Sequence, residues 1–87
     1  MADSRRGLTG AFERAMCPCC EYLTLSRRGV FERCPVCRWI DDPTSSMGHG
    51  RNPVSLLQAQ LNFQAFGAAW DEERINVRKP RPHEHPL

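Results

Sequence analysis

Two short cysteine motifs, each with two thiols separated by two residues, constrain the fold of this chain more than any other feature. The first, Cys-Pro-Cys-Cys, spans 17–20, and the second, Cys-Pro-Val-Cys, spans 34–37. Four thiolates on two such turns can complete a tetrahedral shell around zinc. Aligning the two prolines makes four cysteines equivalent in pairs, and these are the expected metal ligands: Cys17, Cys20, Cys34 and Cys37. The fifth, Cys19, takes the place of Val36 and is a spare thiol.

The chain is short enough that we expect it to need such a site for stability. With 87 residues, of which 40% are hydrophobic, it forms one domain whose core leaves little margin over chain entropy. The odd cysteine count, the paired spacings and the lack of an apolar N-terminal run favour bound metal in a reducing cytoplasm over disulfides. No stretch approaches the roughly 20 apolar residues that a membrane span requires. We therefore expect a cytoplasmic protein with one zinc ion and no membrane association.

Charge gives only weak support for nucleic-acid binding. The formal charge is +2, but four thiolates add four negative charges and zinc returns two, so the zinc-bound form should lie close to neutrality. Four arginines lie in or beside the cysteine segment: Arg27, Arg28, Arg33 and Arg38. Their simpler role is to offset the negative metal centre, because a phosphate-binding surface usually shows a larger basic excess.

The segment between the two motifs alternates in hydrophobicity and predicts a β-hairpin over 22–33. Gly29 suits the left-handed position of a three-residue loop, which would set Leu25 opposite Phe31 and Tyr22 opposite Cys34. Such a hairpin would bring both cysteine turns together at its open end. The predicted fold is therefore a small α+β domain stapled by metal, with a zinc-ribbon or rubredoxin-like knuckle pair on a β-hairpin, followed by one α-helix.

That helix is predicted from Leu56 to about Ala69. Ser55 can cap its first turn, and Gln58 can reach back to complete a capping box. One apolar stripe consists of Leu56, Ala59, Phe63, Phe66 and Trp70, which Leu23, Leu25 and Phe31 of the hairpin would cover.

A second apolar stripe on the helix has few partners in a domain of this size: Leu57, Leu61, Ala65 and Ala68. No charged residue occurs over 52–70. Exposed contiguous apolar surface usually marks an interface, so we expect self-association or a protein partner along this helix. The alternative is that Leu8 and Phe12 of the N-terminal arm fold back over the stripe.

The remaining segments show weaker signals. We expect a flexible N-terminal arm over 1–16, the metal-binding domain with its helix over 17–76, and an extended or disordered tail over 77–87. Asp41 and Asp42 are adjacent, so their side chains should point to opposite sides of an extended chain. Turn formation or helix capping before Pro43 is a simpler role for them than acid–base catalysis. His83 and His85 form only a weak metal-binding pattern.

Three separated motifs then carry a family resemblance. In order they are Cys-Pro-Cys-Cys-x-Tyr-Leu-Thr-Leu, Cys-Pro-Val-Cys-x-Trp-x-Asp-Asp, and Ser-Leu-x-x-Ala-x-x-Asn-Phe-x-x-Phe-Gly-Ala. Over Cys17 to about Ala69 the chain resembles the cysteine-rich CPCC family of small bacterial proteins. This resemblance implies a metal site and a bacterial cytoplasmic setting, but it does not indicate any reaction. Glu21 departs from the pattern, because such turns commonly carry Gly there, and a left-handed non-Gly residue costs about 1 kcal/mol.

Three functions remain open at this point. A non-catalytic zinc module that binds a protein is favoured, because four thiolates leave no open coordination position for water or substrate. A redox protein is the second, either with rubredoxin-like iron in the same shell, which is less expected than zinc, or with Cys19 as a reactive thiol on an exposed turn. The third is a zinc ribbon that binds nucleic acid through Arg27 and Arg28, with Tyr22 or Phe31 stacking on bases.

Overall fold

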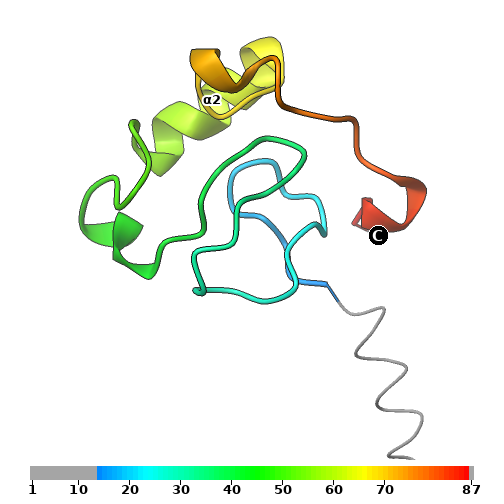
Figure 1. Ribbon diagram of the computed structural model, residues 1–87, viewed down its shortest axis with the longest axis horizontal. Helices are drawn as coiled ribbons and strands as arrows, with labels where there is room; N and C mark the ends of the chain where they lie inside the picture. The colour runs from blue at the N-terminus through cyan, green and yellow to red at the C-terminus, as the bar shows by residue number, and fades with distance from the viewer. Residues whose placement is uncertain (1–13, 87) are drawn as a thin grey trace, which may run out of the picture.

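The computed structural model describes residues 14–86, apart from the side chains of Ser46 and Met47. Its elements are three short 3-10 helices and one α-helix, in the order η1 (Pro43–Met47), α2 (Leu56–Phe66), η2 (Asp71–Glu73) and η3 (Pro82–Glu84). Figure 1 shows α2 lying over irregular loops that carry the cysteines, with η1 and η3 toward opposite ends of the domain. The described residues therefore form one α-helix packed on a cysteine centre that is built from loops.

Each cysteine motif forms a turn that closes on itself, and both turns use the same backbone hydrogen bonds. In the first, the Cys17 N–H donates to the Tyr22 carbonyl at 2.9 Å, and the Glu21 N–H donates to the Cys17 carbonyl at 2.8 Å. In the second, Cys34 donates to Trp39 at 2.8 Å and Arg38 to Cys34 at 2.7 Å. The equivalence that the repeated motif indicated thus extends to the backbone.

The β-hairpin predicted over 22–33 is not confirmed, because the described residues contain no β-strand there. Leu25 forms an isolated bridge with Ala15, and Arg33 forms one with Ile40. Neither bridge joins the two halves of the predicted hairpin. Each one joins the residues before a cysteine turn to the residues after the same turn. Gly29 does adopt a left-handed φ of 74°, as expected for a loop residue.

Helix α2 begins and ends at local signals in the sequence. The Ser55 hydroxyl accepts a hydrogen bond from the Gln58 N–H at 3.1 Å, so the predicted cap is confirmed. The Gln58 side chain does not complete a capping box, since it donates instead to Asn62 at 2.9 Å. The helix ends at Phe66, earlier than predicted, because Gly67 takes a left-handed φ of 84° and its N–H caps the Phe63 carbonyl.

The cysteine turns, rather than a hairpin, cover the inner face of α2. Ala59 is buried there, and Leu56 and Phe63 pack against the same core. The Phe63 ring meets Tyr22 of the first turn edge to face, with 6.3 Å between ring centroids. Of the hairpin residues expected to cover α2, Leu25 is fully buried in the core. Phe31 is exposed, because its ring lies under the Arg51 guanidinium at 4.1 Å instead.

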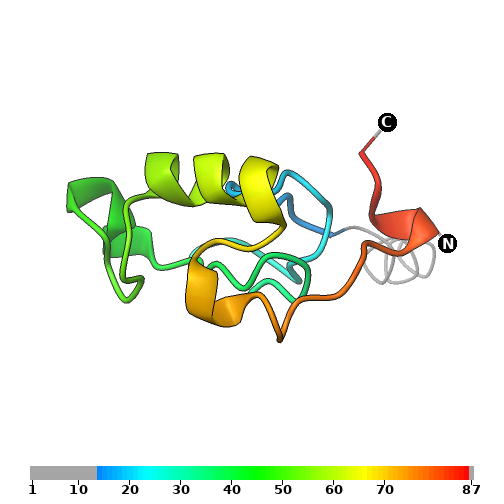
Figure 2. The same cartoon turned by 90° about the horizontal axis from the view of Figure 1, so that it is seen from above.

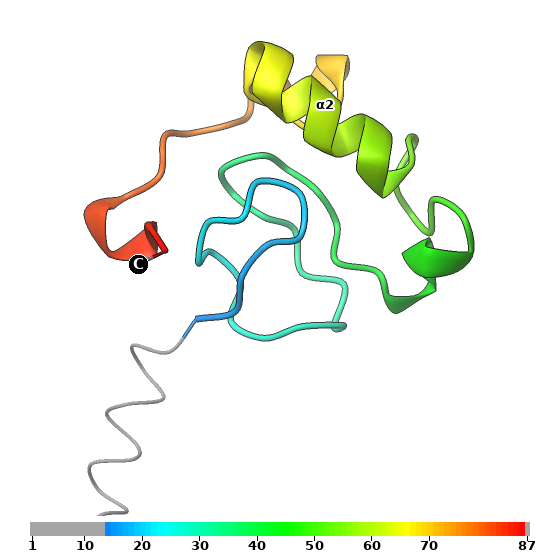
Figure 3. The ribbon, with the colours of Figure 1, turned by 180° about the vertical axis from the view of Figure 1, so that it is seen from behind.

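The C-terminal segment returns to the cysteine turns after η2. Figures 2 and 3 show it running away from α2 as an extended chain, with η3 at the end of the domain opposite η1. The tail predicted over 77–87 as extended or disordered thus has an extended part up to Arg81, then η3, in which Glu84 is buried. The arm predicted over 1–16 lies outside the described residues except for 14–16.

Within residues 14–86, no helix has the length and apolar character needed to cross a membrane.

Candidate metal centre

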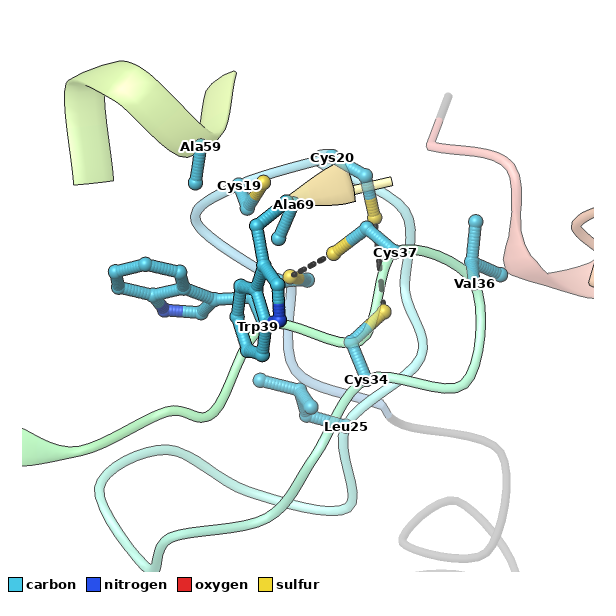
Figure 4. Close-up of a cluster of buried hydrophobic side chains, with 11 residues drawn as sticks. Cys19, Cys20, Leu25, Cys34, Val36, Cys37, Trp39, Ala59 and Ala69 are labelled. Carbon is cyan, nitrogen blue, oxygen red and sulfur yellow. Dashed lines mark hydrogen bonds between the residues drawn. The ribbon is translucent and has the colours of Figure 1, made fainter. Parts of the chain in front are cut away.

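The four cysteines predicted as ligands lie together at the tips of the two turns. All four are buried, and their sulfurs lie within 4.8 Å of one another. The Cys17 and Cys37 sulfurs are 3.6 Å apart, and those of Cys20 and Cys34 are 3.7 Å apart. Figure 4 shows these two contacts as dashed lines, and each joins one turn to the other. Because every close pair joins the two turns, the site exists only when both turns meet.

These separations match what a tetrahedral metal needs. With Zn–S bonds of about 2.3 Å, the sulfurs of a tetrahedron lie about 3.8 Å apart. A disulfide would bring two sulfurs to about 2.05 Å, and all five cysteines are free. The donor set and its spacing therefore fit a single four-coordinate metal ion, which these four cysteines could hold.

The sulfurs also perturb one another's ionisation. The pKa of Cys34 is lowered, whereas the pKa values of Cys20 and Cys37 are raised, and hydrogen bonding with Cys17 is the largest cause of each shift. The neighbouring sulfurs thus favour the charged form of Cys34 and the protonated forms of Cys20 and Cys37. Because a metal ion binds cysteine as the thiolate, metal binding at this site would release protons into solution.

A hydroxyl lies directly against one of the sulfurs. Thr24 is fully buried, and its Oγ1 lies 3.0 Å from Cys34 Sγ. When Cys34 is a thiolate, only the hydroxyl can donate, so Thr24 stabilises the charged form. Such outer contacts orient ligands and tune metal affinity. Thr24 is the Thr of the first family motif, Cys-Pro-Cys-Cys-x-Tyr-Leu-Thr-Leu, but the motif alone does not indicate its contact with Cys34.

One side chain of α2 and one backbone group that follows the helix hold the two turns from outside. Gln60 of α2 donates to the Pro18 carbonyl of the first turn at 2.8 Å, and the Ala69 N–H donates to the Cys37 carbonyl of the second at 2.8 Å. The segment 60–69 therefore bridges both turns. Sequence reasoning missed Gln60, because an amide on a helix gives no sign of its distant partner.

Cys19 does not lie on an exposed turn, so that part of the sequence prediction is wrong. Its side chain is only 5% exposed and belongs to the core cluster. In Figure 4 it lies among Ala59 and Ala69, off the two dashed sulfur pairs. Its equivalent Val36 is also buried, so this position of each turn points into the core.

Asp41 and Asp42 organise two different loops, in agreement with the simpler role predicted for them. Asp41 accepts hydrogen bonds from Arg28 Nε at 2.8 Å and from the Gly29 N–H at 2.7 Å. Asp42 caps η1 by accepting from the Thr44 N–H and hydroxyl at 2.8 and 2.6 Å. Gly50 must remain Gly, because a Cβ there would lie 2.8 Å from the Asp42 carboxyl.

The residues predicted as an interface divide into two groups. Leu57 and Leu61 are 66% and 51% exposed, and Ala65 is exposed beside them on α2. Ala68 is not part of this surface, because the chain leaves the helix at Gly67 and buries Ala68 completely. The outer face of α2 is therefore defined here as Leu57, Leu61 and Ala65.

Comparison with known proteins places the chain in one family. Searches of the curated proteins and of the solved structures found no match. The sequence model of one family, described as "Cysteine-rich CPCC", matches residues 15–84. That range includes both cysteine turns, α2 and η3, which is most of the chain and extends the resemblance seen in the sequence to Glu84. The chain therefore belongs to the cysteine-rich CPCC family.

Proposed function

We propose that this protein binds one zinc ion through Cys17, Cys20, Cys34 and Cys37. It acts as a non-catalytic module that the metal stabilises. The observation that carries the proposal is the buried cluster of four sulfurs, all within 4.8 Å of one another and contributed equally by two equivalent turns. Metal binding would supply folding free energy to a domain whose described residues contain one α-helix, three short 3-10 helices and no β-strand. A reducing cytoplasm, which the sequence predicts, would keep the thiols available.

A non-catalytic role is supported by the donor set and by its surroundings. Four thiolates fill a tetrahedral shell and leave no position for a water or a substrate. A surface hollow of about 720 Å³ is lined in part by Asp41 and Asp42, but both oxygens of each carboxylate already accept hydrogen bonds. The bonds from Thr44 also lower the pKa of Asp42, which makes it a weaker base.

Metal analysis of protein purified without added metal tests this proposal. We expect one zinc per chain by elemental analysis, and a spectrum without visible absorption bands. Visible bands that bleach reversibly on reduction would instead support rubredoxin-like iron, which the same four sulfurs could hold. Protein that folds fully without any metal would contradict the proposal outright.

We further propose that the outer face of α2 packs against a protein surface. Leu57 and Leu61 are exposed next to each other, and no charged residue interrupts the sequence around them. A second copy of this chain is the simplest occupant, because an uncharged helix face meets its own copy without like-charge repulsion. Contiguous apolar surface on a small protein is otherwise unfavourable.

Light scattering at increasing concentration tests this interface. Wild type should show a mass above that of one chain, and Leu61→Glu should return it to one chain without loss of zinc. Ile75→Glu is the matched control, because Ile75 is 89% exposed outside α2 and should tolerate the same charge. A wild type that remains a monomer at high concentration, with Leu61→Glu unfolded, would show that Leu61 is ordinary core.

Nucleic-acid binding receives less support from the contacts. Arg28 is engaged by Asp41, and Arg38 and Arg33 approach Glu73 at 3.0 and 3.8 Å. Phe31, which could have stacked on a base, is covered by Arg51. A binding titration at two salt concentrations would test the point, because phosphate contacts weaken steeply with salt.

A further inference from the structure

The segment 77–86, which follows η2, forms backbone hydrogen bonds to the second cysteine turn and to the residue directly after the first. The Arg78 N–H donates to the Pro35 carbonyl of the second turn at 3.3 Å. Six residues later the Glu84 carbonyl accepts from the Leu23 N–H, beside the first turn, at 2.7 Å. His85 also packs edge to face on Tyr22, with 5.1 Å between ring centroids. This short segment therefore spans the joint between the two turns.

An ion pair between the buried Glu84 and the half-buried Arg78 holds the segment in that position. The Arg78 guanidinium donates to both oxygens of Glu84, at 2.9 and 2.7 Å, and the Arg81 N–H adds a bond of 2.8 Å. Glu84 is only 1% exposed, which is unusual for a carboxylate and requires a partner of this kind. Paired hydrogen bonds between a guanidinium and a carboxylate are strong and geometrically specific. Loss of Arg78 would leave the Glu84 charge buried without its partner and free the segment.

We propose that residues 77–86 form a clasp across the two cysteine turns, and that this clasp, locked by Arg78 and Glu84, controls how fast the metal leaves the site. The inference rests on the proposed function, that Cys17, Cys20, Cys34 and Cys37 hold the metal.

The geometry explains why the clasp would control the rate of release. Each turn supplies two of the four sulfurs, so a metal ion loses half of its ligands only when the turns separate. The clasp holds the Pro35 carbonyl of the second turn and the Leu23 N–H directly after the first turn, and it must open before the turns can separate on its side.

Zinc transfer from the full-length, zinc-loaded protein to an excess of a zinc-binding dye tests the proposal. Glu84→Gln keeps the shape of the side chain and removes its charge, and should release zinc about 10 to 100 times faster than wild type. Asp71→Asn is the control, because it breaks an exposed ion pair, Arg74 with Asp71 at 3.2 Å, and should leave the rate unchanged. If Glu84→Gln does not fold, Arg78→Lys keeps the charge, loses the paired geometry, and should still accelerate release.

Amide hydrogen exchange separates a clasp from general loosening of the domain. In Glu84→Gln, the amides of Leu23 and Arg78 should lose protection, while those of Ala59 and Gly67 in the α2 region should keep it. Equal loss at all four amides, or release at the wild-type rate, would overturn the clasp while leaving the zinc site intact. Wild type that takes up no zinc would instead overturn the proposed function, and the clasp with it.

Discussion

The two cysteine turns have the same backbone but different surroundings. Each closes with the same pair of hydrogen bonds, and each places a non-Gly residue at the same left-handed position, Glu21 with φ 68° and Arg38 with φ 77°. The carbonyl of each proline accepts a bond from outside, Pro18 from Gln60 and Pro35 from Arg78. The motif therefore specifies the turn locally, while different parts of the chain support each copy.

The difference between the turns lies in their exposure. Cys20 of the first turn is 9% exposed, whereas the other three expected ligands are completely buried. A small surface pocket of about 260 Å³ beside the first turn is lined by Cys19, Cys20 and Glu21 together with residues of α2. In the second turn, Arg38 is held by Glu73 at 3.0 Å. The first turn is thus the more accessible side of the centre.

The largest expected effect would test whether this difference matters to the metal. Serine at any one of Cys17, Cys20, Cys34 or Cys37 should abolish stoichiometric zinc binding and unfold the domain, because metal-binding energy here is largely folding energy. Cys19→Ser is the control and should retain one zinc per chain. Elemental analysis with circular dichroism measures both effects. Full zinc retention in Cys20→Ser would show that Cys20, the most exposed of the four cysteines, is not a ligand.

Equivalent aromatic positions should differ in their contribution to stability. Trp39 follows the left-handed residue of the second turn and is completely buried, whereas Tyr22 of the first is partly exposed. Trp39→Ala should lower the free energy of unfolding by about 3 to 5 kcal/mol. Tyr22→Ala should cost about 1 to 2 kcal/mol, because less of its surface is removed from water. Chemical denaturation of the zinc-loaded proteins compares the two.

Trp39→Phe provides the control for that comparison. The indole N–H of Trp39 has no hydrogen-bond partner among the described residues, so its loss should cost little. This variant should recover most of the stability lost in Trp39→Ala. Equal losses in Trp39→Ala and Tyr22→Ala would mean that the two turns are equally embedded.

The pH dependence of zinc release should show whether the Glu84 carboxylate helps to hold the two turns together. Its hydrogen bonds to Arg78 lower the pKa of Glu84 to about 2, from an ordinary value of 4.5. A lowered pKa means that the carboxylate stabilises the fold fully above pH 4.5, and that this contribution is lost as the pH falls toward 2. If zinc is released at a pH above 4.5, the Glu84 carboxylate should therefore still make its full contribution to the stability of the fold.

In Glu84→Gln, the acid midpoint of zinc release should move upward by about a quarter to half a pH unit. This follows from a 10 to 100-fold loss of affinity spread over the uptake of up to about four protons. Titration with a zinc-binding dye measures the midpoint. An unchanged midpoint would show that the segment around Glu84 does not support the centre.

The smallest expected effect concerns the left-handed residues. Glu21→Gly should stabilise the protein by up to about 1 kcal/mol, because it removes the strain of a side chain at positive φ. Arg38→Gly relieves the same strain but also breaks the contact with Glu73, so it should bring no net gain. Denaturation midpoints would separate the two. A gain in both variants would mean that the contact with Glu73 contributes nothing.

Much of the candidate site could be predicted from the sequence, because its signals are local. Two repeated four-residue motifs predicted which cysteines meet, and the positions of their prolines identified Cys19 as the odd thiol. Ser55 likewise predicted the start of α2, because a capping hydroxyl acts within one helical turn. The shape of each turn and the start of α2 depend on neighbours within about five residues.

The tertiary structure decided everything that depends on distant partners. The alternation over 22–33 indicated a hairpin, but Leu25 bonds to Ala15 and Phe31 bonds to Asp41, and both partners lie outside the predicted hairpin. Cys19 became buried only because α2 packs over the first turn. Glu84 gave no sign of burial, since an acidic residue between two histidines is stabilised inside only when Arg78 pairs with it. Local bonding is encoded in short motifs, whereas burial requires the whole chain to be folded around them.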